Sequence, residues 1–182
     1  SLRRRQRQMC IRDRFKGGIV KVLVNTSPLI LLAKANLLGI LERLFGKVWT
    51  SSIVWDEVMW PLRHGIRALD AEMIRSCGWI EVLDLNDEEL EMLDDVMSRL
   101  RIDPGEASLA ALYQRGFEAI IVADKEAEEK LKGEGFNVMD LSELIVLAAN
   151  KNFVDAREAA RKIWDAGYKV EEIERLMLGQ AP

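Results

Sequence analysis

Two short apolar runs, each followed at once by a polar side chain, most strongly limit what this chain can fold into. The first, Ile19–Val24, is rich in β-branched residues and is followed by Asn25. The second, Ala119–Ala123, is fully apolar and is followed by Asp124. Runs of this length and composition predict strands that are buried on both faces, as in parallel sheets. We expect the two strands to be neighbours at the centre of one sheet.

Longer segments with helical periodicity alternate with short apolar runs. This order predicts an α/β fold rather than a helix bundle or a β-sandwich. The other predicted strands cover residues 47–50, 79–83 and 136–139. Predicted helices cover residues 28–35, 37–45, 52–60, 67–76, 87–99, 103–113, 124–132, 141–150, 155–166 and 170–178. We expect Ser27 to cap the first helix, with Pro28 at its first position, and Pro61 to end the third.

The chain length suits a single folded unit. Its 182 residues, 49 % of them hydrophobic, are enough for one covered core and too few for two full domains. We expect a domain over residues 19–150 and a helical extension, residues 151–182, packed on it. The longest apolar stretch is far shorter than the ~20 residues needed to cross a bilayer, so no membrane span is predicted. Two cysteines and one histidine predict neither a disulfide framework nor a zinc cluster, which favours a cytoplasmic location.

The charge is unevenly distributed. Residues 1–16 hold seven of the 26 basic side chains but one of the 30 acidic ones, so the rest of the chain is strongly acidic. This segment has no periodicity and resembles translated sequencing-adapter read-through, which suggests that it is non-native. The alternative is a disordered basic arm that contacts nucleic-acid phosphates. We therefore leave residues 1–16 out of the argument on fold and function.

The polar residues at the predicted strand ends suggest a site. In open parallel sheets, ligands bind beyond the carboxyl ends of the strands, where the strand order reverses. A site beside Asn25 and Asp124 would also be reached by the helices that carry Glu57 and Glu106. Three carboxylates and one amide, without His or Cys, are ligands that suit Mg²⁺ or Mn²⁺. The expected chemistry is metal-assisted hydrolysis of phosphodiester bonds.

Three motifs resemble those of PIN domains, specifically a prokaryotic PIN-like branch that binds nucleic acid. They are VNTSPLI at residues 24–30, PGEA at residues 104–107 and IIVADK at residues 120–125. The resemblance covers about residues 20–177 and implies a three-layer α/β/α fold with four or five parallel strands. It also implies similarity to toxin ribonucleases of the VapC type, with RNA as substrate and a small antitoxin protein as candidate partner.

The resemblance also implies which residues form the site. Carried over position by position, the acidic tetrad of the family falls on Asn25, Glu57, Glu106 and Asp124, which would hold Mg²⁺ or Mn²⁺. The supporting hydroxyl would come from Thr26 or Ser27.

Asn25 departs from the family pattern, in which Asp is most frequent at this position. An amide oxygen can ligate a hard cation but adds no charge, so we expect weaker metal binding than with Asp. Two functions remain open. One is a metal-dependent ribonuclease, and the other is a catalytically weakened PIN-like module that binds RNA or protein.

Each candidate residue also has a structural explanation. Asn is favoured in turns before helices, which applies to Asn25. Asp103 and Glu106 have the spacing of a capping box at a helix start. Asp124 could cap the following helix, and Glu57 could be a solvated surface charge. For Asp124 we expect a deep position at the end of an apolar strand, which favours a functional role.

Two predictions concern residues outside the site. Trp55, Met59 and Trp60 have helical spacing and are predicted as core, with a homodimer contact as the alternative because aromatic residues and Met are enriched in interfaces. Lys125 is predicted as a solvated helix side chain rather than as a phosphate contact.

Overall fold

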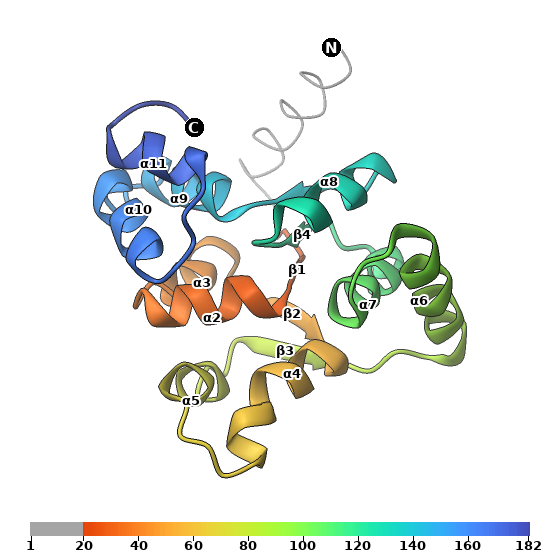
Figure 1. Ribbon diagram of the computed structural model, residues 1–182. Coiled ribbons are helices and arrows are strands. Elements are labelled where there is room, and N and C mark those ends of the chain that lie inside the picture. Colours follow the sequence, from red (N-terminus) through yellow and green to blue (C-terminus); the bar gives the residue numbers. More distant parts are fainter. Residues whose placement is uncertain (1–19) are drawn as a thin grey trace.

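Five parallel strands form the centre of the fold, in the order β3-β2-β1-β4-β5 (Figure 1). The computed structural model describes residues 20–182, and the predicted basic tail at residues 1–16 lies outside them. The strands are β1 (Val22–Val24), β2 (Val48–Ser51), β3 (Ile80–Leu83), β4 (Ala119–Ile121) and β5 (Val138–Met139). The predicted α/β fold with a four- or five-stranded parallel sheet is confirmed.

Helices cover both faces of this sheet. They are α2 (Thr26–Lys34), α3 (Gly39–Phe45), α4 (Ser52–Arg63), α5 (Leu69–Arg75), α6 (Asp87–Leu100), α7 (Pro104–Leu112), the 3₁₀ helix η1 (Tyr113–Arg115), α8 (Lys125–Gly133), α9 (Leu141–Asn150), α10 (Ala156–Asp165) and α11 (Glu171–Met177). Figure 1 shows α2, α3 and α5 on one side of the sheet and α6 and α7 on the other. The arrangement is therefore the predicted three-layer α/β/α fold.

Strand β1 lies in the middle of the sheet, between β2 and β4. Its three side chains are fully buried, which explains why the segment is so rich in β-branched residues. Leu23 pairs with Trp49 of β2 on one side and with Ile120 of β4 on the other. The chain runs outward from β1 through β2 to β3 and then returns to β4, so the strand order reverses at β1. This reversal opens a crevice beyond the carboxyl ends of β1 and β4.

Two predicted helix boundaries are wrong. Helix α2 begins at Thr26 with Asn25 as its N-cap, so Ser27 is not the cap and Pro28 is not the first helical residue. Pro61 does not end α4, which continues to Arg63. A proline so near the end of a helix removes only one hydrogen bond and leaves the last turn in place.

Coverage of α4 also differs from the prediction. Trp55, Met59 and Trp60 are predicted as core, but the Trp60 side chain is 53 % exposed and stacks on His64 with the ring centroids 4.2 Å apart. Met59 is buried and Trp55 is half-buried. Trp60 is therefore not a core residue, and its role in a homodimer contact remains a prediction.

The last two helices share the core of the sheet domain. Ile163 of α10 and Ile173 of α11 are fully buried and belong to the same apolar cluster as β1. Helix α10 packs on α9 and α2, and α11 packs on α9 and α10. Within residues 20–182 we find no helix with the length and apolar character that a membrane crossing requires.

Candidate functional site

Three side-chain oxygens surround one point beside Gly105, in the first turn of α7. A methyl group built on Gly105 would lie 3.2 Å from Asn25 Oδ1, 3.2 Å from Asp103 Oδ1 and 3.4 Å from Glu57 Oε2. These residues come from the end of β1, the loop before α7 and the middle of α4. Glycine at this position leaves open the space that the three oxygens face.

Asn25 has a buried oxygen without a hydrogen-bond partner. The backbone N–H of Asn25 donates to the Ile121 carbonyl at 3.0 Å, which ties the end of β1 to β4. The residue is 4 % exposed, and no donor in the described part of the chain reaches Oδ1. A buried acceptor left unpaired costs about 1–3 kcal/mol. A hydrogen-bond donor or a cation beside this oxygen would therefore remove a cost in free energy.

Glu57 is held by a hydroxyl from the start of α2. Thr26 Oγ1 donates to Glu57 Oε2 at 2.8 Å, while the Glu57 side chain is otherwise exposed. Of the two predicted supporting hydroxyls, it is thus Thr26 that contacts the acidic cluster. Ser27 is exposed on α2.

Glu106 and Asp103 form the predicted capping box at the start of α7. The Glu106 N–H donates to Asp103 Oδ1 at 2.8 Å, and the Asp103 N–H donates to Glu106 Oε2 at 3.3 Å. Burial, together with the negative charges of Asp103, Asp124 and Glu57, raises the pKa of Glu106 to about 7. These carboxylates therefore disfavour the charged form of Glu106.

Asp124 lies across a small hollow from Glu106. It caps α8 by accepting the Ala127 N–H at 2.8 Å. The hollow measures about 200 Å³ and is lined by Arg101, Ile102, Asp103, Glu106, Asp124, Glu126, Ala127 and Lys130. Asp124 is exposed, so its predicted depth is wrong: the strand ends at Ile121, three residues earlier, and Asp124 reaches the surface.

The structure thus brings all four predicted tetrad positions to one rim of the sheet, together with Asp103. Sequence reasoning assigned Asp103 to the helix cap alone, because a capping carboxylate normally turns to its own helix. Nothing in the sequence alone indicates that the same carboxylate also faces Asn25 and Glu57.

The donor set fits a hard divalent cation in an open site. In the described residues, no three His, Cys, Asp or Glu side chains are gathered tightly enough to hold a metal ion directly. Mg²⁺ usually keeps several waters and takes one or two carboxylates from the protein, so it does not require such a cage. The unpaired Asn25 oxygen and the space at Gly105 provide the remaining features of a cation site.

A second charged cluster lies on the far side of α8. Lys125 Nζ lies 2.9 Å from Asp140 Oδ2, 3.0 Å from Glu172 Oε1 and 3.2 Å from Glu128 Oε2. The prediction that Lys125 is a solvated side chain is wrong, because three carboxylates bind it. Although burial opposes the charged form of Asp140, hydrogen bonds from Ser142, from the Glu143 N–H and from Lys125 hold its pKa below the usual range.

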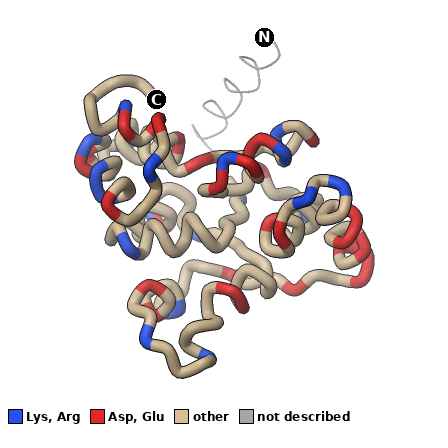
Figure 2. The backbone as a smooth tube through the Cα atoms, viewed as in Figure 1, with Lys and Arg blue, Asp and Glu red and all other residues tan. Residues whose placement is uncertain are grey.

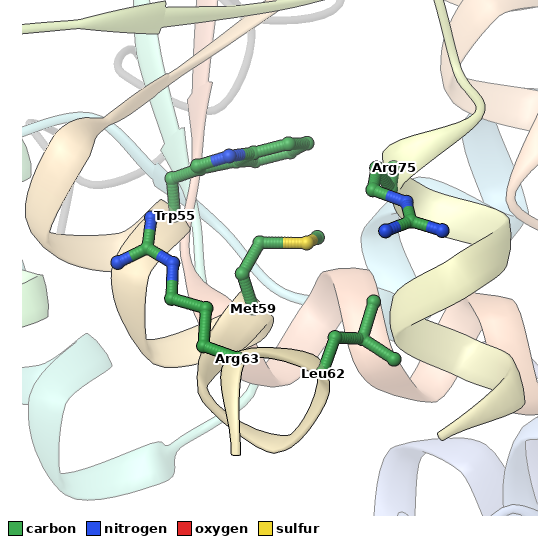
Figure 3. Close-up of a pocket in the computed structure, with 5 residues that line it drawn as sticks. All are labelled: Trp55, Met59, Leu62, Arg63 and Arg75. Atoms are coloured by element: carbon green, nitrogen blue, oxygen red, sulfur yellow. The ribbon is translucent and has the colours of Figure 1, made fainter. Parts of the chain in front are cut away.

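A pocket of about 280 Å³ opens between α4 and α5, away from the acidic cluster. Figure 3 shows the residues that line it: Trp55, Met59, Leu62, Arg63 and Arg75. Trp55, Met59 and Leu62 recur at helical spacing on α4, on a different face from Glu57. This pocket contains none of the predicted tetrad residues.

The sheet order and the acidic rim define a three-layer α/β domain with a candidate cation site at its switch point. A family model described as PIN domain matches residues 21–173. The chain belongs to this family, whose members are typically metal-dependent nucleases.

One solved structure supports the fold. The crystal structure of PAE2754 from Pyrobaculum aerophilum is similar with a TM-score of 0.51 and 23 % sequence identity, covering 74 % of this chain and 94 % of that one. At this identity the similarity concerns the fold alone. A search of curated proteins found no match.

Proposed function

We propose that this chain is a metal-dependent ribonuclease of the PIN type, similar to toxin ribonucleases, that hydrolyses RNA with Mg²⁺ or Mn²⁺. The observation that carries the proposal is the buried, unpaired Asn25 Oδ1 beside the oxygens of Glu57 and Asp103. Membership of the PIN-domain family adds a second, independent reason.

Each tetrad residue has a role in this proposal. Asn25, Glu57, Glu106 and Asp124 would hold the cation, directly or through its bound waters, and Thr26 orients Glu57 through its hydroxyl. A bound divalent cation supplies charge neutralisation at a phosphoryl oxygen and a lowered pKa for an attacking water. The capping box fixes Glu106 at the start of α7, where a carboxylate also faces the positive end of the helix dipole.

Two basic side chains at the hollow provide a place for the phosphates of the RNA backbone to bind. Arg101 and Lys130 line the same depression as Glu106 and Asp124; Lys130 Nζ donates to the Arg101 carbonyl at 3.1 Å and also forms an ion pair with Glu126. Lys and Arg contacts to phosphates provide most of the sequence-independent affinity of nucleic-acid binding. We assign the phosphate next to the cleaved bond to the part of the hollow beside Arg101 and Lys130.

We propose that a protein partner binds an acidic surface, the outer side of α6. Figure 2 shows acidic residues along the outer side of α6. They include the exposed Asp87, Glu88, Glu91, Asp94 and Asp95. This face repels RNA, and it is suited to a basic segment of a small antitoxin protein.

The test of the proposed function is Asp124→Asn, which keeps the cap on α8 but removes one charge from the site. Asn caps helices about as well as Asp. We expect purified wild type to bind Mn²⁺ in calorimetric titration and to cleave RNA with Mn²⁺ or Mg²⁺, and Asp124→Asn to lose both. Cleavage that survives the substitution would point to a contaminating nuclease and count against the proposal.

Asp155→Asn is the matched control. Asp155 caps α10 with the same geometry, accepting the Glu158 N–H at 2.9 Å, and it is exposed. It contacts none of the tetrad residues. Metal binding and cleavage should therefore equal those of the wild type.

The alternative function is a PIN-like module without turnover that binds RNA or protein. The observation that favours it is the neutral amide of Asn25, which leaves the site with less charge for a cation than Asp would. Asn25→Asp separates the two functions. Cleavage by Asn25→Asp and none by the wild type would support the binding module, whereas cleavage by both supports the ribonuclease.

A further inference from the structure

We propose that Asp103, besides capping α7, supplies the cation-facing charge that Asn25 lacks. The inference rests on the proposed metal site and adds a residue to it. Asp103 would thus be a fifth ligand-bearing position, close enough to Asn25 to compensate for its neutral amide.

The first argument is the position of the Asp103 carboxylate. Its Oδ1 lies at the same distance, 3.2 Å, from the point beside Gly105 as Asn25 Oδ1 does. Glu57 Oε2 faces the same point at 3.4 Å. A cation drawn to the amide oxygen therefore meets two carboxylates, and Asp103 is one of them.

The second argument is the state of Asn25. Its Oδ1 is buried, faces this point and is unpaired with respect to residues 20–182. A buried acceptor of this kind is stabilised by a positive charge. The need for a positive charge here arises from the unpaired amide oxygen of Asn25 and does not depend on the number of acids nearby.

The third argument is that capping alone does not require a charge here. In the capping box of α6, the neutral Asn86 accepts the Glu89 N–H at 2.9 Å, so an amide fills the same structural role. In the capping box of α9, the Asp140 carboxylate is neutralised by Lys125 at 2.9 Å.

The box of α7 differs from both. It has a charged cap, yet no ion pair formed within residues 20–182 involves Asp103 or Glu106. The carboxylates of Asp103 and Glu57, which face the same point beside Gly105, leave a local negative charge that a divalent ion would balance. Asp103 therefore carries a charge that its structural role does not use.

The test is a set of Mn²⁺ titrations by calorimetry on four proteins: wild type, Asp103→Asn, Asn25→Asp and the double variant. Asp103→Asn keeps the cap and removes the charge, and we expect its Mn²⁺ affinity to fall about tenfold to a hundredfold, the usual range for a residue that supports a metal site. Asn25→Asp should bind more tightly than the wild type. The double variant, which exchanges the two side-chain types, should return to within about threefold of the wild type.

A denaturant midpoint measured with a chelator checks that each variant folds. It should be at least as high in Asp103→Asn as in the wild type, because Asn is an equally good cap and the substitution removes a charge that repels Glu106. Asp155→Asn again serves as control for an Asp to Asn change at a helix cap and should leave Mn²⁺ affinity unchanged.

The outcomes separate this inference from the proposed function. If the wild type binds Mn²⁺ and Asp103→Asn binds it equally well, the role of Asp103 is refuted while the metal site stands. If neither the wild type nor Asn25→Asp binds Mn²⁺, the metal site itself is refuted. Loss of affinity in Asp103→Asn with recovery in the double variant supports the inference.

Discussion

The hydroxyls of Ser51 and Ser108 lie 2.6 Å apart and join the start of α4 to α7. Both residues are fully buried. Ser108 donates to the Gly105 carbonyl at 2.6 Å, and Ser51 accepts the Val54 N–H at 3.0 Å as the N-cap of α4. The two helices that carry Glu57 and Glu106 are thus tied together beneath the acidic rim.

Ser108→Ala should lower the free energy of unfolding by about 1–2 kcal/mol, because the buried Ser51 hydroxyl loses its acceptor. Chemical denaturation measures the change. Mn²⁺ affinity should also fall, since the helix pair that positions the two glutamates is loosened. Ser98→Ala, on the exposed side of α6, is the control and should change neither quantity. A stable Ser108→Ala protein would show that the hydroxyl pair is dispensable.

Gly105→Ala should abolish or strongly weaken Mn²⁺ binding while the protein stays folded. The added methyl group would occupy the point that Asn25, Asp103 and Glu57 face, at 3.2 to 3.4 Å from their oxygens. Calorimetric titration measures binding, and urea denaturation with a chelator measures stability. Gly133→Ala is the control, because a methyl group at the end of α8 meets no atom within 4 Å. Unchanged affinity in Gly105→Ala would mean that no cation occupies this space.

Glu106→Gln should stabilise the metal-free protein above neutral pH. The folded-state pKa of Glu106 is about 7 against an ordinary value of 4.5, so the folded chain keeps a proton that the unfolded chain releases. Its contribution to stability therefore falls as pH rises from 4.5 to 7 and stays low above that. We expect the variant to exceed the wild type by about 1–3 kcal/mol at pH 8 and to equal it near pH 4.

Denaturation of both proteins in a chelator across this pH range measures the difference. Added Mn²⁺ should reverse the order, because a cation stabilises the ionised carboxylate of the wild type and has less effect on Gln. A constant difference across all pH values would show that Glu106 does not titrate in the predicted window.

Lys125→Met should lower the free energy of unfolding by about 1–3 kcal/mol, because it leaves the buried Asp140 without its counter-charge, whereas Glu128 keeps its ion pair with Lys132. The figure is smaller than for a fully buried pair, since the Lys125 side chain is 36 % exposed. Lys162→Met is the control, because it removes an exposed ion pair with Glu158, which contributes about 0–1 kcal/mol. Equal effects of the two substitutions would contradict a special role of the cluster.

The elements that sequence predicts well here are those with local causes. Strands β1 and β4 follow from buried β-branched and apolar runs, and their pairing follows from their equal apolar character. The capping box of α7 follows from two residues three positions apart in the chain. Such signals depend on neighbours in sequence, so a single sequence contains them.

The features that the sequence does not predict depend on contacts between residues that are far apart in the chain. The role of Lys125 is set by Asp140 and Glu172, which are brought near by β5 and α11. Likewise, Asp103 faces the site because the end of β1 and the middle of α4 lie beside it, and no local pattern encodes that contact. The intrinsic preference of proline predicts a helix end at Pro61, but so near the end of α4 it removes only one hydrogen bond and the helix continues to Arg63.

The central place of β1 also governs when the acidic cluster can exist during synthesis. Asn25 is among the first residues of the described chain to be made, but its neighbour β4 and the cap at Asp124 come much later. Because chains leave the ribosome from their N-terminus, the nascent protein cannot complete the cluster until residue 124 has emerged. An unfinished chain therefore lacks the complete candidate cation site.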